Sequence, residues 1–301
     1  MSTRPPIIVL GAHRSGTSAL ARVLEALGVF VGARLDPNHE ARFFLELDEW
    51  LLAQCGARWD QPAAIHWLLD DEGQSRLAVE HLARCMRTPR AREFLGLRRW
   101  LANPRLDRQT MSWGWKEPRA TFTLPLWLRV FPDARVLHVH RHGVDVAHSL
   151  CRRHREHLAR SEAAFETNRV LLGWLRKRAG FGDSPRLSTL MGGFTLWEEY
   201  VREARRHVAA LGPNALELRY EDLAARPLEL VREVARFCGL DVDEARLGRA
   251  ASIIAKDRAG AHRHDQALAA LAAELAPRVQ ALRDPPASAI AAEPRVAARA
   301  T

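Results

Sequence analysis

The stretch Pro6-Ile-Ile-Val-Leu-Gly-Ala-His-Arg-Ser-Gly-Thr-Ser18 decides the fold of this chain. Its apolar run, Ile7 to Leu10, stops at a glycine, and a helical pattern begins at Ala19 after a short polar loop. This strand–loop–helix order is typical of a phosphate-binding loop, in which consecutive backbone N–H groups point at an anion above a helix N-terminus. The stretch therefore predicts an anion site at the end of a buried strand.

One position within the loop separates two kinds of chemistry. The loop of a nucleoside triphosphatase reads G-x-x-x-x-G-K-[ST], and its lysine reaches the β- and γ-phosphates. Gly11 and Gly16 keep this spacing, but Thr17 occupies the lysine position, and the loop carries its cation at Arg14 instead. This composition favours a site for one phosphate group over a site for a triphosphate with magnesium.

The composition favours a globular protein with anionic partners. The chain has 301 residues, 47% of them hydrophobic, which is enough for one large α/β domain or two small ones. Its net charge of +9 and isoelectric point near 10.3 indicate nucleotides, nucleic acid, acidic glycans or a membrane surface as partners. Most of the basic residues are arginines, which suit bidentate recognition of phosphate.

Hydropathy and cysteine usage bear on where the protein works. No apolar stretch approaches the ~18 residues of a membrane span, and the apolar run after Arg4 is too short for a signal peptide. The cysteines Cys55, Cys85, Cys151 and Cys238 are scattered and form no Cys-x-x-Cys pair. We therefore expect a cytoplasmic protein with reduced thiols and no membrane span, and its oligomeric state stays open.

Strand and helix patterns alternate along the chain. Strands are predicted over 6–10, 111–115, 134–140 and 215–219. Helices are predicted over 18–27, 40–55, 74–101, 121–131, 144–211 with a break at 180–185, 227–238 and 243–255. This alternation favours an α/β fold, a parallel sheet with flanking helices. Residues 1–275 are predicted as one domain, and residues 276–301, rich in Ala, Pro and Arg without an apolar period, as a flexible tail.

A second anion signal follows the strand at 134–140. Arg141 ends this strand, Gly143 permits a tight strand-to-helix turn, and Ser149 falls about two turns into the following helix. Ligands of open α/β sheets collect beyond the carboxyl ends of the strands, where both Arg141 and the first loop lie. A ligand with two separated phosphates is therefore expected, with Arg141 and Ser149 sharing one of them.

Four segments of the chain resemble motifs of bacterial sulfotransferases. They are residues 11–18, 115–119, 136–149, and 218–223 with Pro227 and residues 237–240 after it, and the resemblance covers roughly 5–240. It implies a sulfotransferase fold of the P-loop nucleotide-binding type. It also implies PAPS (3′-phosphoadenosine 5′-phosphosulfate) as the donor, PAP as the product, and a hydroxyl or amine on a small-molecule or glycan acceptor, without a metal.

The resemblance also assigns residues to the donor. The 5′-phosphosulfate side is assigned to Gly11, His13, Arg14, Ser15, Gly16, Thr17 and Ser18, and the 3′-phosphate to Arg141 and Ser149. Arg14 and Lys116 are expected to stabilise the charge that develops on the transferring oxygens and the leaving phosphate. No metal ligand is expected.

The chain departs from the family at two places. His142-Gly143 stands where many members have Asp-Pro, and Lys116 is followed by Glu117-Pro118 instead of a pattern that ends in a catalytic histidine. Bacterial members often carry an acidic residue just before an amphipathic helix, and here that residue is Glu40. Glu40 is therefore the candidate general base, with Glu46 and Glu117 as alternatives.

Alternative functions remain at this stage. A P-loop kinase or nucleoside triphosphatase is disfavoured by the missing loop lysine. A non-catalytic protein that binds PAP or nucleic acid is suggested by the charge, but nucleic acid is not expected because no arginine stripe is interleaved with aromatics. The histidines 138, 140, 142, 148, 154 and 157 have no cysteine or carboxylate at ligand spacing, which disfavours a metal site. The basic stretch 152–155 is either a solvated helix face or a contact for an anionic acceptor.

Overall fold

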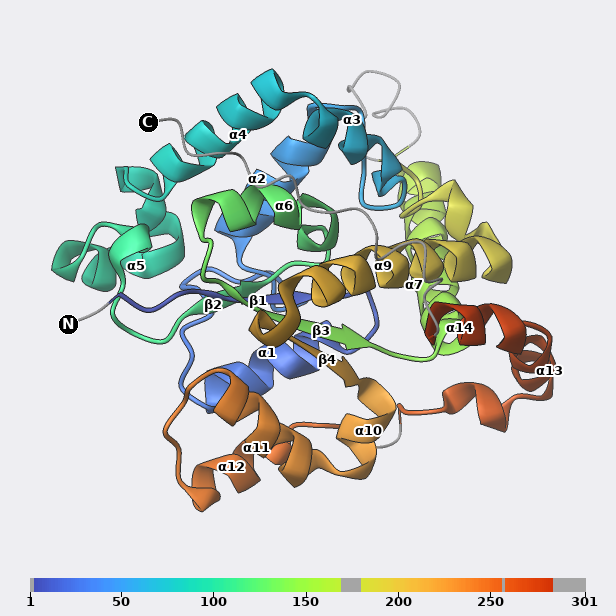
Figure 1. Ribbon diagram of the computed structural model, residues 1–301. Helices are drawn as coiled ribbons and strands as arrows, with labels where there is room; N and C mark the ends of the chain where they lie inside the picture. The colour runs from blue at the N-terminus through green and yellow to red at the C-terminus, as the bar shows by residue number, and fades with distance from the viewer. Residues whose placement is uncertain (1–2, 169–179, 256–257, 284–301) are drawn as a thin grey trace.

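A parallel four-stranded sheet lies at the centre of the computed structural model, which describes residues 3–168, 180–255 and 258–283 (Figure 1). Its strands are β1 (Ile7–Leu10), β2 (Gly114–Lys116), β3 (Arg135–His140) and β4 (Ala215–Arg219). They stand in the order β2-β1-β3-β4, and each neighbouring pair is parallel. The predicted α/β fold, a parallel sheet with flanking helices, is confirmed.

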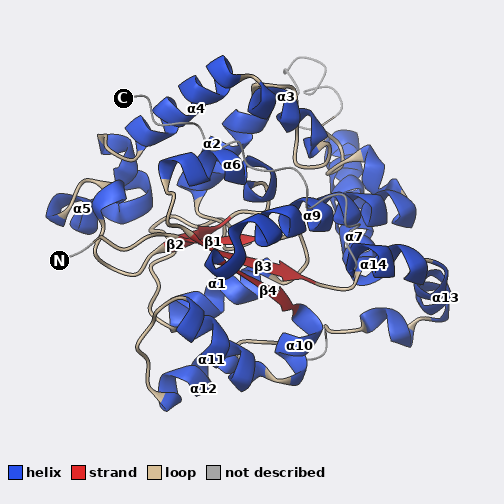
Figure 2. Cartoon of the chain, viewed as in Figure 1, coloured by secondary structure: helices blue, strands red, loops and turns tan. Residues whose placement is uncertain are grey.

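Helices cover both faces of the sheet (Figure 2). One layer holds α2 (Arg42–Ala53), α3 (Ile65–Asp70), α4 (Glu72–Cys85), α5 (Arg92–Ala102), α6 (Ala120–Val130) and α9 (Leu190–Leu211). The other holds α1 (Thr17–Ala26), α10 (Tyr220–Ala225), α11 (Pro227–Phe237) and α12 (Glu244–Ala251). The long helix α7 (Gly143–Thr167) lies with α13 (Gln266–Glu274) and α14 (Ala276–Arg283) at one end of the sheet (Figure 1).

The side chains of β1 alternate between two hydrophobic cores, as the period of a strand requires. Ile8 and Leu10 join the core under α2, α6 and α9, whereas Ile7 and Val9 join the core under α1, α11 and α12. All four are at most 3% exposed, because helices cover both sides of the strand. This complete burial explains why the sequence shows a continuous apolar run instead of an alternating one.

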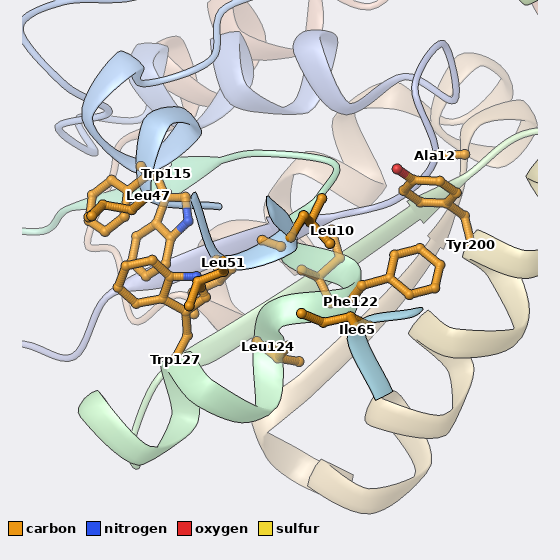
Figure 3. Close-up of a cluster of buried hydrophobic side chains, with 14 of the residues drawn as sticks. Leu10, Ala12, Leu47, Leu51, Ile65, Trp115, Phe122, Leu124, Trp127 and Tyr200 are labelled. Atoms are coloured by element: carbon orange, nitrogen blue, oxygen red, sulfur yellow. The ribbon is translucent and has the colours of Figure 1, made fainter. Parts of the chain in front are cut away.

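Aromatic side chains fill the larger core. Phe44 of α2 stacks on Trp115 of β2 with ring centroids 3.9 Å apart, and Trp127 of α6 meets Trp115 edge-on at 5.2 Å. Figure 3 shows Trp115 and Trp127 beside Leu47 and Leu51 of α2. This packing fixes α2 against the sheet, and so fixes the residues that precede α2.

Several predicted boundaries move. The helical region 74–101 divides into α4 and α5, separated by a short 3-10 helix at Pro89–Ala91. The strand predicted at 111–115 lies at Gly114–Lys116. The helical region predicted to run to 211 contains α7, which ends at Thr167, and α9, which begins at Leu190; residues 169–179 lie outside the described residues.

The tail that the sequence predicts from residue 276 begins with a packed helix instead. Ala276–Arg283 form α14, in which Arg278 donates from Nε to Glu198 of α9 at 2.9 Å. The Arg278 guanidinium also lies 5.2 Å from the centre of the Phe194 ring. Val279 and Leu282 of α14 also pack against the larger core, so apolar contacts and the contacts of Arg278 together hold this segment. Residues 284–301 lie outside the described residues.

No helix within the described ranges is long and apolar enough to cross a lipid bilayer.

Candidate active site

A cavity of about 400 Å³ lies beyond the carboxyl edge of the sheet, where the strands end. The loop after β1 contributes His13 and Arg14 to its wall, and the end of β2 contributes Lys116. Arg141 follows β3, and Tyr220 follows β4. Because all four strands are parallel, residues from distant parts of the sequence meet at this one edge.

The loop after β1 is shaped by two glycines. Gly11 has φ +138°, and a Cβ there would lie 2.2 Å from the carbonyl oxygen of Val139. Gly16 has φ +105°, and its Cβ would lie 2.4 Å from a ring carbon of Tyr220. A side chain at either position would push the loop off β3 or off Tyr220, so the spacing seen in the sequence is required by close approach as well as by backbone conformation.

Ser15 supports the loop from below. The Oγ atom of Ser15 lies 2.7 Å from the carbonyl oxygen of Ala12 and 3.0 Å from that of Val139, and its hydroxyl can donate to either. The residue is fully buried. Gly11 is buried beside it, and neither residue lines the cavity. Both shape the loop that forms this part of the cavity wall.

The upper side of the loop offers donors to an anion. Gly16, Thr17 and Ser18 line the cavity at the start of α1, where no side chain caps the helix. The first amides of a helix have no intrahelical acceptor and carry the positive end of its dipole. Arg14 adds a cation, in a backbone conformation with φ +71°, and donates from Nε to Ser149 Oγ at 3.0 Å.

His13 is the neutral member of the loop. Its ring lies against Trp59 with centroids 4.9 Å apart, and its Nε2 atom has no hydrogen-bond partner. Burial, and then the positive charges of Arg119, Arg153, Lys116 and Arg14, hold the pKa of His13 well below its usual range. The imidazole is therefore uncharged at neutral pH and leaves the loop's positive charge to Arg14.

The second predicted anion site surrounds Arg141. Its guanidinium lies 3.2 Å from Asp145 and donates to the carbonyl oxygen of Arg258, while its Nε atom has no partner. Arg141 is 9% exposed, so that the unpartnered Nε is a buried donor beside a cavity. Ser149 lines the same cavity, but its contact is with Arg14 and not with Arg141.

Glu40 lies at the opposite side of the cavity, two residues before α2 begins. Lys116 donates from Nζ to Glu40 Oε1 at 2.9 Å and to the carbonyl oxygen of Asn38 at 2.8 Å. The backbone N–H of Glu40 donates to Asp36 at 2.7 Å, which closes the turn that holds the residue. Burial raises the pKa of Glu40 to about 7, the charge of Glu117 adds to this, and Lys116 opposes it.

The two alternative bases lie elsewhere. Glu46 is exposed on α2 and does not line the cavity. Glu117 is fully buried, pairs with Arg119 at 2.7 Å, and also lies off the cavity wall. Of the three candidate carboxylates, Glu40 is the one that the fold brings to the cavity beside Lys116 and the loop.

The cavity wall is strongly cationic. Among the described residues it includes the six cations Arg14, Lys116, Arg141, Arg152, Arg153 and Arg258, against two carboxylates, Glu40 and Asp145. Burial, and then Arg153, Arg258, Arg152 and Arg141, lower the pKa of Arg14 from its usual value. This surplus of like charge favours the binding of anions.

Sequence reasoning missed several residues of the wall. Arg258 comes from the segment after α12, which shows no motif, and Tyr220 belongs to the segment 218–223, to which no ligand contact was assigned. The stretch 152–155 divides, since Arg152 and Arg153 line the cavity whereas Arg155 is exposed outside it. The helical period of α7 could have separated them, because residues three and four after Ser149 share its face.

The histidine-rich strand forms no metal centre. The described part of the chain contains no group of three or more His, Cys, Asp or Glu side chains placed to hold a metal ion. His140 pairs with Glu217 at 2.9 Å, and His138 is fully buried below it. Burial, with the nearby His140, lowers the pKa of His138 to about 3, so this imidazole stays neutral.

An anion-binding loop after β1 and an arginine after β3, at one edge of a parallel sheet, define a nucleotide-binding fold of the P-loop type. The chain belongs to the sulfotransferase family, because its sequence matches the family's profile over residues 5–244.

Solved structures with similar folds are also sulfotransferases. STF1 from Mycobacterium tuberculosis is 19% identical, with a TM-score of 0.43 over 83% of this chain and 71% of that chain. STF9 from Mycobacterium avium is 17% identical, with a TM-score of 0.43 over 93% and 77%. A sulfotransferase from Alicyclobacillus acidocaldarius is 19% identical, with a TM-score of 0.42 over 80% and 83%. Comparison with curated proteins gives no match.

Proposed function

We propose that this sulfotransferase moves the sulfuryl group of PAPS to a hydroxyl or amine of a small-molecule or glycan acceptor. The observation that carries the proposal is the single cavity that joins the loop after β1, the arginine after β3 and a buried carboxylate beside a lysine. A donor with a 5′-phosphosulfate and a 3′-phosphate needs two anion sites on one wall. A transfer to a neutral hydroxyl also needs a proton acceptor nearby.

The residues present fit such a donor. The uncapped start of α1 and Arg14 suit the 5′-phosphosulfate, since helix N-termini and arginine bind oxyanions. The buried Nε of Arg141 suits the 3′-phosphate, because a buried donor without a partner is costly and an anion would satisfy it. Arg258 lines the same end of the cavity and adds charge to this site.

The protein residues account for the transfer step. The acceptor oxygen forms a bond to sulfur while the bond from sulfur to the 5′-phosphate oxygen breaks, and the acceptor proton passes to Glu40. Arg14, Lys116 and the loop amides stabilise the negative charge on the transferring oxygens and the leaving phosphate. Because the pKa of Glu40 is raised to about 7, its carboxylate is a stronger base than an exposed one.

Calorimetry with PAP and ADP tests the donor assignment. We expect PAP to bind about 10- to 150-fold more tightly, which is the range for one charge-assisted hydrogen bond of roughly 1.5–3 kcal/mol. Arg141→Gln should remove most of the preference while circular dichroism shows a folded protein. Equal affinities of the unaltered protein for PAP and ADP would contradict the 3′-phosphate site.

An acceptor screen with sulfate-labelled PAPS tests the reaction itself. Transfer to a hydroxyl or amine supports the proposal. Tight PAP binding without transfer to any acceptor would indicate a non-catalytic binding protein. Magnesium-dependent turnover of ATP would indicate a kinase or nucleoside triphosphatase instead.

A further inference from the structure

Helix α7 lines the cavity with one continuous face. Asp145, His148, Ser149, Arg152 and Arg153 all reach the wall, at the three- and four-residue spacing that places side chains on one side of a helix. The first part of this face lies beside Arg141, as the contact between Arg141 and Asp145 shows. The last part extends about one turn beyond Ser149, with an arginine at each of its two cavity positions.

Arg153 belongs to the end of the cavity that holds the proposed base. Its guanidinium lies 5.2 Å from the centre of the Trp59 ring, and His13 contacts the same ring with centroids 4.9 Å apart. The charges of both Arg153 and Lys116 act on His13, and Lys116 pairs with Glu40. Arg153 therefore lies beside Trp59 and His13, in the part of the wall that leads toward Lys116 and Glu40, where the proposed acceptor would bind.

Arg153 is held in a fixed orientation. It donates from Nε to Asp183 at 2.6 Å, and His157 binds the other oxygen of Asp183 at 2.8 Å. The bond to Asp183 uses Nε, and neither terminal nitrogen makes a hydrogen bond among the described residues, so both can donate to a bound group. No other carboxylate of the described residues pairs with Arg153. An arginine that packs on an aromatic ring and is oriented by a carboxylate is suited to bind an oxyanion.

Arg152 adds a second cation on the same face. Its side chain is 60% exposed, and its carboxylate neighbour Glu156 lies 3.7 Å away, a loose contact. Both arginines act on Arg14, whose pKa is lowered by burial and then by the surrounding cations. Arg14, Lys116, Arg141 and Arg258 lie where the proposed donor would bind, and Arg152 and Arg153 extend the cationic wall beyond them along α7.

We propose that the acceptor of this sulfotransferase is itself an anion, bearing a phosphate, sulfate-ester or carboxylate group that Arg152 and Arg153 bind while its hydroxyl or amine faces Glu40. This inference rests on the proposed function. It names the class of acceptor, and it assigns Asp183 as the residue that positions Arg153.

The test compares matched acceptors, whose binding is measured on the protein saturated with PAP and whose sulfation is measured with labelled PAPS without added PAP. The pairs are glucose 6-phosphate with glucose, glucuronate with glucose, and 4-hydroxybenzoate with 4-hydroxybenzyl alcohol. Calorimetry measures binding, and labelled PAPS measures transfer. We expect the anionic member of at least one pair to bind, and to be sulfated with a kcat/KM at least tenfold above that of its neutral partner. Equal binding within every pair, or binding of neither member, would overturn the inference.

Three variants test which arginines of α7 cause the preference for the anionic acceptor. Arg153→Gln should remove the preference for the anionic member, a loss of about tenfold or more, and the more exposed Arg152→Gln should lower it a few-fold. Arg155→Gln is the matched control, since it removes the same charge from the same helix outside the cavity, and it should keep the preference. A loss as large in Arg155→Gln as in Arg153→Gln would show that net charge, and not this face, is responsible.

PAP affinity separates this inference from the proposed function. If the unaltered protein fails to bind PAP, the donor assignment fails and the acceptor class falls with it. If the protein binds PAP and sulfates neutral acceptors as well as anionic ones, the sulfotransferase function holds and the anionic acceptor is wrong. The Arg152 and Arg153 variants should retain PAP affinity within a few-fold.

Discussion

Arg14 and Ser149 are hydrogen-bonded at 3.0 Å although they stand 135 residues apart in the sequence. Arg14 lies in the loop after β1, and Ser149 lies in α7, which follows β3. The sequence predicted these two places as separate anion sites, with Ser149 beside Arg141. The bond joins them into one wall, so a ligand that binds Arg14 meets α7 directly.

Glu40→Gln should lower kcat by ~10²–10⁴, which is the usual contribution of a general base. The carboxylate is the active form and the pKa of Glu40 is about 7, so the rate of the unaltered enzyme should rise with pH through about 7 and level off above it. The variant should lose this rise, because an amide does not titrate. Initial rates between pH 5.5 and 9 measure both effects.

Two controls accompany the Glu40 measurement. Glu46→Gln removes a carboxylate from the exposed side of α2 and should change kcat little. PAP affinity should stay within a few-fold in both variants, because Glu40 is assigned to the proton and not to the donor. Near-normal turnover of Glu40→Gln, together with an inactive Glu117→Gln, would move the base to Glu117.

Transfer should proceed without a divalent metal. Arg14, Lys116 and the amides at the start of α1 line the cavity where charge develops, and they can supply the stabilisation that magnesium gives in phosphoryl transfer. Turnover after treatment with EDTA and dialysis should therefore equal that of the untreated enzyme. Activity that chelation abolishes and magnesium restores would count against this assignment.

Gly16→Ala should damage both the loop and its ligand affinity. The new Cβ would lie 2.4 Å from the Tyr220 ring, at a φ of +105° that an alanine rarely adopts. We expect a loss of roughly 2–4 kcal/mol in the free energy of unfolding and at least a tenfold weaker binding of PAP. Denaturant unfolding and calorimetry measure the two quantities.

Gly56→Ala is the matched control for the loop glycine. Gly56 also has a positive φ, +68°, but a Cβ there would meet no atom within 4 Å. This variant should lose only the conformational term of about 1–2 kcal/mol and should bind PAP normally. If Gly16→Ala behaved like Gly56→Ala, the close approach of Tyr220 would not matter to the loop.

Removal of α14 should lower stability. A chain that ends at Leu275 lacks Arg278, its ion pair with Glu198 and its contact with Phe194, whereas a chain that ends at Arg283 keeps all of them. We expect the shorter chain to melt about 5 °C below the longer one, a difference of roughly 1–2 kcal/mol for a domain of this size. Equal melting temperatures would restore the interpretation of residues 276–283 as a tail.

Local sequence patterns predicted the strands and helices, but they did not predict the contacts between residues far apart in the sequence. All four strands and the loop after β1 could be predicted, because apolar runs that stop at Gly11 or Arg141 are readable within a few residues. The strand order β2-β1-β3-β4 could not, since it depends on pairing across more than 100 residues.

The residues of the candidate site also differ in how far the sequence alone could predict them. The resemblance to bacterial sulfotransferases pointed to Glu40 as a candidate base, but the raised pKa of Glu40 depends on burial and on Glu117, which no local pattern reveals. Arg153 looked like one charge in a basic run, and its role follows from Trp59 and Asp183, both remote in the sequence. The packing of α14 was missed because Val279 and Leu282 are its only large apolar side chains, and Glu198, which pairs with Arg278, is remote in the sequence.

The sheet order also determines when the binding site comes into existence. β1 precedes the other three strands in the sequence, but its neighbours β2 and β3 begin at residues 114 and 135, and Arg258 follows much later. The loop after β1 therefore lacks the strands and side chains that complete the cavity until those later segments have been synthesised. Closing such long loops is slow, because chain entropy opposes it until the strands pair. The cavity therefore forms only after strands remote in the sequence have paired, which makes its assembly a late step of folding.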